Sequence, residues 1–422
     1  MSIYDKASLV QIPSGYKSGT LYSVVPNTAD GDFTVTGDPQ GEATRVNKDG
    51  LIETVSANVP RLNYNPTNPQ DPTLLLEPTS TNLLQRSEDY DNGYWLKARV
   101  GSSATGFTAP DGSSNATYYE QASGQTTAAV IYKSGFTSAS SGVYTFSIWA
   151  KKAEKRYLKL QTRANSATYR TVFDLQDGVI TYDSGNENEK IEEYPNGWYR
   201  LSVQRTSTTT DDIIVYYYLN DSAVQSDTVT DSGGVYIWGS QVEKTNHLTS
   251  YIPTTTAQVT RTADTCKLEN FADIPTSYPF TAFVDMDIIE DEKGYGFSIL
   301  DISSSANYFS VGYSEDGGNL GKFRFTNRAQ GTAYNFNTIS TYGTGRYKIA
   351  VKFISATNLK AFIDGVEIAD YTHASSAFNT NINDVLLGQL RVAGDTSDRS
   401  PIHQFMIFNE ELSDSELQTL TT

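Results

Sequence analysis

Alternation of apolar and polar residues around an Asp-Gly pair constrains the fold of this chain more than any other feature. Residues 347–353 alternate between apolar and polar or small side chains, and residues 359–363 lead through Asp364-Gly365 into residues 366–368. A period of two is typical of a β-strand with one buried face. An Asp-Gly pair between two such segments favours a hairpin with a type I′ turn. This part of the chain is therefore predicted to be antiparallel sheet.

The end of the chain predicts one buried strand followed by a short helix. Residues 402–408 read as apolar on both faces, which is typical of a strand deep in a sandwich. Ser413 and Glu416 have the spacing of a capping box, and Leu412 and Leu417 have that of a hydrophobic staple. We expect two sheets closed by a helical turn, a scaffold suited to recognition that does not require catalysis.

Composition extends the β-sheet prediction to the whole chain. The 422 residues include 31 Gly, 28 Tyr and 18 Phe, and only 19% are charged. Thr, Ser, Tyr, Val and Asn dominate, which is typical of sheets with exposed polar faces. The length suggests about three domains. We therefore predict an all-β protein.

Charge and cysteine content exclude several classes of protein. The net charge is −17, from 32 basic and 49 acidic residues, and such a surface repels nucleic acid and anionic membranes. The single cysteine, Cys266, excludes an intramolecular disulfide and a cysteine-based zinc site. No apolar run reaches the roughly 18 residues that span a bilayer, and residues 1–17 lack the blocks of a secretory signal. We expect a soluble protein made in a cytoplasm, with no nucleic-acid binding and no membrane insertion.

Residues 1–80 are expected to form an irregular segment, because they contain eight of the 14 prolines. Proline removes a backbone donor and disfavours central strands and long helices. This segment is either a linker or an anchoring arm that orders against a partner or against neighbouring copies. Apolar pieces such as residues 21–25 and 74–76 favour the arm, because they are too apolar for a solvated linker.

The rest of the chain predicts two antiparallel β-sandwiches of the jelly-roll type, at 81–264 and 265–422. In the first sandwich, clusters of Gly, Asn and Asp separate the strand candidates at typical intervals. The pairs Asp177-Gly178 and Asn196-Gly197 predict turns. The strand candidates are residues 144–150, 157–162, 171–175, 198–203, 213–219 and 235–238.

A set of short motifs is spread over residues 43–254. It comprises ATRVNKDGLIE (43–53), NVPRLNY (58–64), LLLEP (74–78), TNLL (81–84), SEDY (87–90), YW (94–95), APDG (109–112), NGWYR (196–200), QVE (241–243) and TSYIPT (249–254). These motifs resemble those of a group of tailed-bacteriophage virion proteins. In that group the first sandwich resembles a carbohydrate-binding-module-like jelly roll, and residues 280–420 resemble a concanavalin A-like, laminin-G-type sandwich.

The resemblance implies a non-enzymatic protein on the virion surface, a tail or head fibre or spike that is assembled in the host cytoplasm. It further implies attachment to other virion proteins through the N-terminal arm, a trimeric homo-oligomer, and adhesion to host surface polysaccharide. Two alternatives remain open. One is a purely structural decoration of the capsid or tail without glycan binding, and the other is a glycan depolymerase.

Strand alternation identifies side chains for a glycan-binding face on the first sandwich. In each of three predicted strands, the side chains on one face are apolar. The side chains on the opposite face include Trp149, Tyr157, Lys159, Trp198 and Arg200. Aromatic rings pack on the C–H faces of sugars while polar groups bind the hydroxyls. We predict a glycan platform; the alternative is that a loop, the N-terminal arm or a neighbouring subunit covers these aromatics. Trp238 and the tyrosines at 216–218 are interpreted as sandwich core.

The best catalytic candidates are the acids Asp285, Asp287 and Glu290. They resemble the Glu-x-Asp-x-(x)-Glu strand of concanavalin A-like glucanases, in which paired carboxylates hydrolyse a glycosidic bond. Asp285 is one methylene shorter than the expected Glu, and Glu290 points to the opposite face unless a bulge intervenes. We expect a strand edge with solvated acids and no catalytic residues.

No cofactor or metal site is predicted. The three histidines lack metal-like spacing, and His403 is interpreted as a satisfied core residue of the last strand. Acidic loops at residues 316–319 and 395–399 have the oxygen ligands that calcium prefers. Turn formation explains the same residues more simply.

Overall fold

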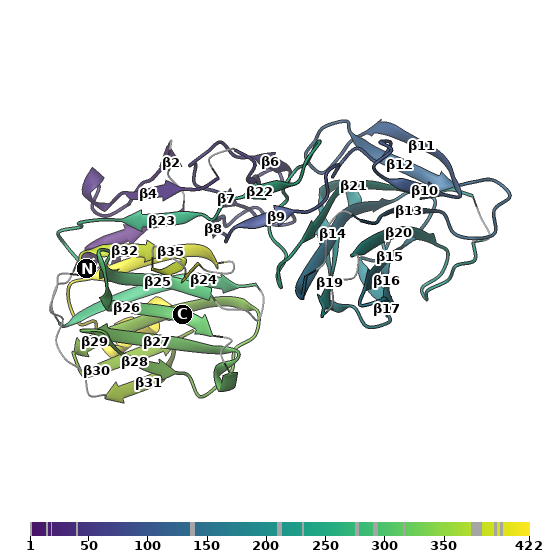
Figure 1. Cartoon of the computed structure of the whole chain (residues 1–422). Coiled ribbons are helices and arrows are strands. Elements are labelled where there is room, and N and C mark those ends of the chain that lie inside the picture. The colour runs from purple at the N-terminus through teal and green to yellow at the C-terminus, as the bar shows by residue number, and fades with distance from the viewer. Residues whose placement is uncertain are drawn as a thin grey trace.

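The computed structural model of the chain is built almost entirely of β-strands, as predicted. It describes residues 2–13, 16–17, 19–38, 41–135, 140–208, 213–229, 232–274, 278–289, 294–314, 317–372, 382–391, 395–396 and 400–422. In this part of the chain the only α-helix is α1, Asp414–Thr421, with short 3-10 turns at Ile3–Lys6, Ala29–Gly31, Pro195–Gly197 and Gly317–Asn319. Figure 1 shows two sandwiches joined by a layer of short strands.

The first sandwich consists of two antiparallel sheets. Its strands are β10 (Leu96–Ala98), β11 (Val100–Phe107), β12 (Ala116–Gln121), β13 (Val130–Lys133), β14 (Gly142–Lys152), β15 (Tyr157–Ala164), β16 (Ala167–Asp174), β17 (Val179–Asp183), β18 (Glu187–Tyr194), β19 (Trp198–Ser207), β20 (Ile214–Asn220) and β21 (Gly234–Glu243). The sheet orders are β10-β13-β20-β15-β16-β17 and β11-β12-β21-β14-β19-β18. All six predicted strands are present. Their apolar rows, represented by Phe146, Leu158 and Leu201, face the core between the sheets.

The second sandwich holds the predicted hairpin and the last strand. Its strands are β24 (Phe280–Ile288), β25 (Gly294–Asp301), β26 (Ser304–Ser314), β27 (Lys322–Ala329), β28 (Thr332–Asn337), β29 (Gly345–Ser355), β30 (Asn358–Ile363), β31 (Val366–Thr372), β32 (Asp384–Leu387), β33 (Gln389–Arg391), β34 (Asp395–Thr396) and β35 (Ser400–Phe408). Asp364 and Gly365 have φ of 47° and 75°, so both central residues of the hairpin turn are in the conformation that a type I′ turn requires.

The N-terminal segment contributes strands to the sheets of the second sandwich instead of forming the separate irregular arm that we expected. Its strands, with the two that follow the first sandwich, are β1 (Leu9–Gln11), β2 (Tyr16–Lys17), β3 (Thr20–Leu21), β4 (Phe33–Thr36), β5 (Thr44–Val46), β6 (Ile52–Thr54), β7 (Leu62–Asn63), β8 (Thr73–Leu76), β9 (Ser80–Asn82), β22 (Val259–Arg261) and β23 (Thr265–Leu268). Seven of them extend the sheets of the second sandwich to β31-β30-β29-β24-β35-β8-β7, with β1 on β35, and to β2-β3-β4-β23-β32-β25-β26-β27-β28. The other four form the separate two-stranded sheets β5-β6 and β9-β22.

Burial explains why this segment packs. Leu9, Leu21 and Leu74 are fully buried in the core of the second sandwich. The prolines keep each strand short, while the apolar residues between them supply core side chains whose exposure would cost free energy. Sheet pairing therefore joins residues 1–80 to the second sandwich, and the exact domain boundaries stay a prediction.

The C-terminal helix has the caps that the sequence predicts. The Ser413 hydroxyl accepts a hydrogen bond from the backbone of Glu416, and the Glu416 carboxylate accepts one from the Ser413 backbone. Leu412 and Leu417 are buried in one cluster against the second sandwich. The capping box and the staple therefore fix how the helix enters and where it docks.

A buried ionic cluster fastens the N-terminal segment, the first sandwich and the connector between the sandwiches. The Arg61 guanidinium donates to Glu77 at 2.7 Å, to the hydroxyl of Ser250 at 2.8 Å, and to Asp264. Arg261 lies 3.6 Å from Glu77. All these side chains are at most 7% exposed. Each charge is therefore stabilised by the opposite charges and polar groups of the cluster instead of by water.

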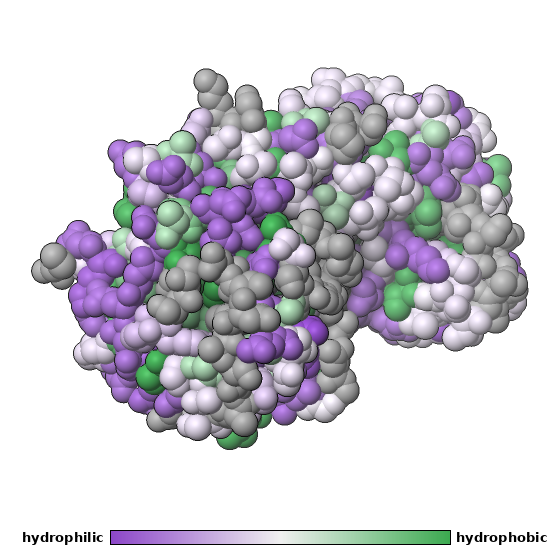
Figure 2. Space-filling model, turned by 60° about the vertical axis from the view of Figure 1, so that its left-hand side comes forward, coloured by the Kyte–Doolittle hydropathy of each residue, from purple (hydrophilic) through white to green (hydrophobic). Residues whose placement is uncertain are grey.

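The surface is largely polar on the face shown in Figure 2, where apolar residues form small separate patches. Three of the exposed large apolar side chains belong to the N-terminal segment: Tyr4 at 49%, Tyr22 at 41% and Val24 at 48% exposure. Such residues are candidates for contact with another molecule.

Candidate functional site

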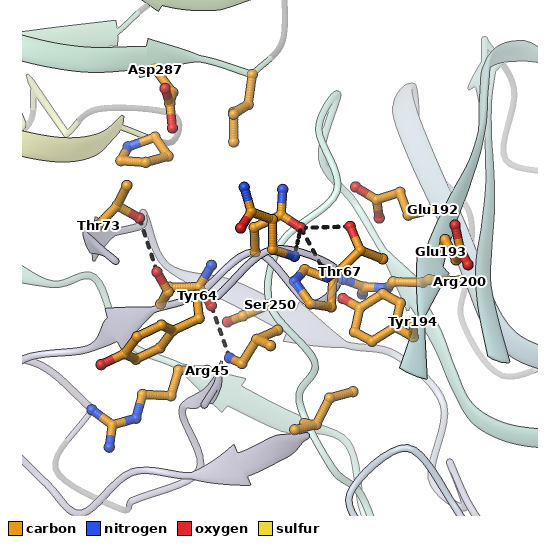
Figure 3. Close-up of a pocket in the computed structure, with 18 of the residues that line it drawn as sticks. Arg45, Tyr64, Thr67, Thr73, Glu192, Glu193, Tyr194, Arg200, Ser250 and Asp287 are labelled. Carbon is orange, nitrogen blue, oxygen red and sulfur yellow. Dashed lines mark hydrogen bonds between the residues drawn. The ribbon is translucent and has the colours of Figure 1, made fainter. Parts of the chain in front are cut away.

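A cleft of about 600 Å³ opens where the N-terminal segment meets both sandwiches. Figure 3 shows Glu193 and Arg200 of β18 and β19 on one side, Asp287 of β24 on the opposite side, and Tyr64 and Thr67 of the N-terminal segment between them. Most of the lining side chains are polar. The site therefore arises from three segments that are far apart in the sequence.

The middle of the cleft is a loop that organises itself by local hydrogen bonds. The side-chain oxygen of Asn65 accepts bonds from the Thr67 backbone at 3.0 Å, from the Thr67 hydroxyl at 3.0 Å and from the Asn68 backbone at 3.2 Å. Pro66 fixes one backbone angle inside this turn. The loop also presents Tyr64, a half-buried aromatic ring. It therefore offers hydroxyl, amide and aromatic groups on a rigid support.

The wall from the first sandwich combines exposed acids with a buried aromatic pair. Glu192 and Glu193 are exposed at the end of β18. The Arg200 guanidinium lies 4.3 Å from the ring centroid of Trp149, and the Trp149 ring meets Tyr194 edge-on at 5.8 Å. Cation–π and aromatic contacts of this kind hold the ring and the guanidinium in fixed positions along the wall.

The wall from the second sandwich is a network of charged groups. Arg346 forms a bidentate pair with Asp285, with both bonds at 2.7 Å, and also contacts Asp71. The His403 ring lies 3.1 Å from Asp287 and 3.3 Å from Asp71. Asp71 of the N-terminal segment is thereby tied to two residues of the second sandwich, which closes one end of the cleft.

The protonation of this network follows from its charges. Burial opposes the charged form of His403, but the hydrogen bond and negative charge of Asp287 outweigh it and raise the pKa of His403. Burial likewise opposes ionisation of Asp71, but the Arg346 hydrogen bond and the nearby positive charges lower its pKa. The interpretation of His403 as a core residue is wrong, because its ring lines the cleft between two carboxylates.

The acids proposed as catalytic candidates are engaged in these contacts. Both oxygens of Asp285 are bound by Arg346, which stabilises the carboxylate and leaves it poorly placed to attack a sugar. Asp287 is paired with His403. Glu290 lies outside the described residues, so the position of the third acid stays a prediction. The arrangement is suited to holding a ligand by hydrogen bonds.

The residues predicted to form one glycan face lie on two different sheets. Trp149 is on β14, and Trp198 and Arg200 are on neighbouring β19, whereas Tyr157 and Lys159 are on β15 of the opposite sheet. The prediction of a single shared face is therefore wrong. Alternation shows which residues of a strand point the same way, but it does not show which strands share a sheet.

The tryptophan part of the predicted face is covered, which was the alternative interpretation. Trp149 and Trp198 are 1% and 2% exposed. They pack with Trp238 and Tyr251 of the first sandwich and its connector, and with Val46 and Ile52 of the N-terminal segment. Only the edge formed by Trp149 and Arg200 remains part of the cleft wall.

Sequence reasoning missed the loop residues of the cleft. Asn65-Pro66 and Asn68-Pro69 are turn signals, and they mark the place where polar side chains are held rigidly. Their role depends on both sandwiches lying next to the loop, which no local pattern indicates.

Across the residues with assigned placement, no group of three or more His, Cys, Asp or Glu side chains is arranged to hold a metal ion. Asp316 and residues 397–399, which carry part of the calcium hypothesis, lie outside the described ranges. None of the helices in the described part of the chain combines the length and apolar character needed to cross a bilayer.

Comparison with known proteins supports the fold of the second sandwich. Residues 260–418 match the family model Laminin_G_3, described as the concanavalin A-like lectin/glucanases superfamily. The second sandwich thus has a concanavalin A-like fold, as the resemblance of residues 280–420 predicted. No curated protein matches the chain.

Solved structures share partial similarity with the chain. The IT-sialidase CBM40 of Ruminococcus gnavus is 17% identical, with a TM-score of 0.31, covering 36% of this chain and 87% of that one. Domain 4 of a GH43 extracellular arabinanase from Geobacillus stearothermophilus, in complex with arabinotriose, is 14% identical, with a TM-score of 0.32 and coverages of 38% and 73%. A heptameric SAP-like pentraxin from Limulus polyphemus is 12% identical, with a TM-score of 0.28 and coverages of 35% and 72%. At these TM-scores the similarities carry no argument about function.

Proposed function

We propose that this protein is a non-enzymatic, glycan-binding protein of the virion surface of a tailed phage, and that the cleft between its sandwiches holds a host surface glycan. The observation that carries the proposal is the lining of the cleft. Asparagine, threonine, glutamate, arginine and histidine side chains supply many hydrogen-bond donors and acceptors, and Tyr64 supplies a half-buried ring. A ligand that presents hydroxyls beside C–H faces matches this set.

The concanavalin A-like match of residues 260–418 supports glycan binding, because that superfamily is described by its lectins and glucanases. The virion location rests on the sequence resemblance alone. Attachment to other virion proteins, trimer formation and assembly in the host cytoplasm belong to the same proposal. The exposed Tyr4, Tyr22 and Val24 of the N-terminal segment offer a surface for such a contact.

Many copies on one particle would make weak sites effective. Linked binding events raise the effective concentration of each site, so avidity exceeds single-site affinity by about 10²–10⁴. A cleft with weak single-site affinity is therefore sufficient for adhesion.

One observation favours a second candidate, a purely structural appendage without glycan binding. The tryptophans that were expected to bind sugar, Trp149 and Trp198, are instead buried under the N-terminal segment. In that case the aromatic cluster holds the N-terminal segment against the first sandwich, and the cleft results from this packing without binding a ligand.

The test compares glycan binding by the full chain and by Tyr64→Ala. A glycan array identifies a ligand, and titration followed by tryptophan fluorescence measures its affinity, because Trp149 lies on the cleft wall. We expect Tyr64→Ala to weaken binding about tenfold, corresponding to about 1.4 kcal/mol for a lost ring contact. Tyr334→Ala, which removes another half-buried tyrosine outside the cleft, is the matched control. A wild-type chain that binds no glycan contradicts the proposal and supports the structural appendage.

A further inference from the structure

A row of three tyrosine rings lies on the outer face of the first sandwich, away from the cleft. Tyr132 and Tyr216 stack with centroids 5.2 Å apart and planes inclined by 21°. Tyr216 and Tyr218 stack at 5.9 Å and 22°. All three rings are half-buried. They form a flat aromatic strip on the sheet that contains β13, β20, β15 and β16 (Figure 1).

Strand register explains the strip. Tyr132 of β13 lies directly across from Tyr216 of β20, and Tyr218 follows two residues later on the same face. Tyr217, between them, points inward and is fully buried. The interpretation of residues 216–218 as sandwich core is therefore correct for Tyr217 and wrong for its two neighbours.

Positive charge gathers beside the strip. The Lys159 ammonium lies 4.5 Å above the ring centroid of Tyr218 and donates to Asp227 at 2.5 Å and to the Ser226 carbonyl at 2.8 Å. Arg170 and Arg99 act electrostatically on the same Asp227 and on Tyr218. Lys159 thus pairs directly with Asp227 at one end of the strip, and Arg170 and Arg99 lie near enough to act on the same carboxylate through their charge.

A fourth cation acts on the middle of the strip. Arg163 is exposed on β15 and forms a hydrogen bond with Tyr216. The Arg170 side chain is held in place across the strands by a bond from its Nε to the Gln161 oxygen at 2.8 Å. The guanidiniums are therefore positioned along the rings.

This concentration of positive charge is unusual for a chain whose net charge is −17. Burial lowers the pKa of Lys159 against the opposing hydrogen bond and charge of Asp227, and the charge of Arg170 adds to the lowering, so Asp227 offsets the repulsion between these cations only in part. An anion placed among them removes that repulsion. Guanidiniums bind carboxylates with two parallel hydrogen bonds, and tyrosine rings pack against the C–H faces of sugars.

We propose that this face binds an acidic polysaccharide built of carboxylated sugars, with sugar rings on Tyr132, Tyr216 and Tyr218 and carboxylates on the adjacent arginines. The proposal rests on the proposed glycan-binding function and adds a second site, on the other sheet of the first sandwich. Of the residues predicted for a glycan face, Lys159 lies next to this strip, but its side chain is fully buried and bonded to Asp227 and Ser226, so it supports Tyr218 and Asp227 from within.

The experiment measures binding of the full chain to polygalacturonate by affinity electrophoresis or calorimetry. Fully methyl-esterified polygalacturonate is the matched ligand, because it keeps the backbone and loses the carboxylates. We expect the ester to bind at least tenfold more weakly, and binding of the acid form to weaken as salt increases. Equal binding of acid and ester overturns the assignment of carboxylated sugars.

Two variants test whether the polymer binds at the tyrosine strip. Arg170→Gln is expected to weaken polygalacturonate binding about tenfold and to reduce its salt dependence, and Tyr216→Ala is expected to weaken binding of both polymers. Arg324→Gln is the matched control, because the Nε of Arg324 also donates to a side-chain amide across the strands, to Asn337 at 3.0 Å. Unchanged melting temperatures show that the variants are folded.

The two glycan proposals fail in distinguishable ways. If Tyr64→Ala abolishes polygalacturonate binding while Arg170→Gln and Tyr216→Ala leave it intact, the polymer binds in the cleft and the tyrosine strip is not a site. If polygalacturonate binding depends on Arg170 but Tyr64→Ala changes no glycan affinity, the strip stands and the cleft proposal fails. A chain that binds no glycan overturns both.

Discussion

The buried ionic cluster around Glu77 gives the sharpest test of how the parts of this protein are joined. The Glu77 side chain is fully buried and accepts hydrogen bonds from Arg61 at 2.7 Å, from the Ser250 backbone at 2.8 Å and from the Ser250 hydroxyl at 2.6 Å. Burial opposes the charge on Arg61, but the charges of Asp264 and Glu77 outweigh it and raise the pKa of Arg61. The substitution Glu77→Gln keeps the shape and removes the charge.

The expected loss in free energy of unfolding follows from the charges that remain in the cluster after the substitution. After the substitution, Arg61 and Arg261 remain buried with Asp264 as their nearby carboxylate. Breaking a buried ion pair by removing one partner costs about 3–5 kcal/mol. For a cooperative unit of about 150–250 residues, that corresponds to a decrease in melting temperature of roughly 6–20 °C.

Urea unfolding followed by tryptophan fluorescence measures this cost, and Glu53→Gln is the control. Glu53 also pairs with an arginine, Arg45, at 2.6 Å, but its side chain is 36% exposed. A solvent-exposed pair contributes about 0–1 kcal/mol. If Glu77→Gln costs no more than Glu53→Gln, the reasoning that burial makes this cluster essential is refuted.

Three further predictions concern the rest of the chain. The raised pKa of His403 means that its charged contact with Asp287 stabilises the fold fully below about pH 6.5 and is lost as the pH rises through the raised value. The melting temperature of the wild-type chain should therefore fall over that pH range, and His403→Gln should lack this decrease. A variant with the same pH profile as the wild type contradicts this. Gly234→Ala places a Cβ 1.9 Å from the carbonyl oxygen of Tyr119 and should cost about 3 kcal/mol in urea unfolding, whereas Gly93→Ala, with open space around it, should cost much less. Ser413→Ala removes the helix cap and should cost about 1 kcal/mol by the same measurement; no change would show that the helix is held by packing alone.

Local sequence patterns determined the elements of this fold. The period-two alternation of residues 347–353 and the Asp364-Gly365 pair produced the predicted hairpin, with both turn residues at positive φ. Alternation also assigned the inward row of β14 and β19 correctly. These outcomes depend on interactions between residues close in the sequence and on the burial of one strand face, which are the properties that a pattern encodes.

The candidate sites depended on contacts between distant residues. The cleft brings Tyr64, Arg200 and His403 together from three segments. Which outward side chains are covered was decided by the N-terminal segment, whose Val46 and Ile52 bury the tryptophans.

The sequence by itself therefore determined that the chain forms sheets, where its strands turn, and which side chains lie on opposite faces of a strand. The tertiary structure alone decided that the N-terminal segment completes the second sandwich, that Lys159 and Trp149 lie on different sheets, and that Tyr216 and Tyr218 face outward. The physical reason is that hydrogen bonding and alternation act along one strand, whereas the order of strands and the covering of a face follow from burying apolar area contributed by the whole chain.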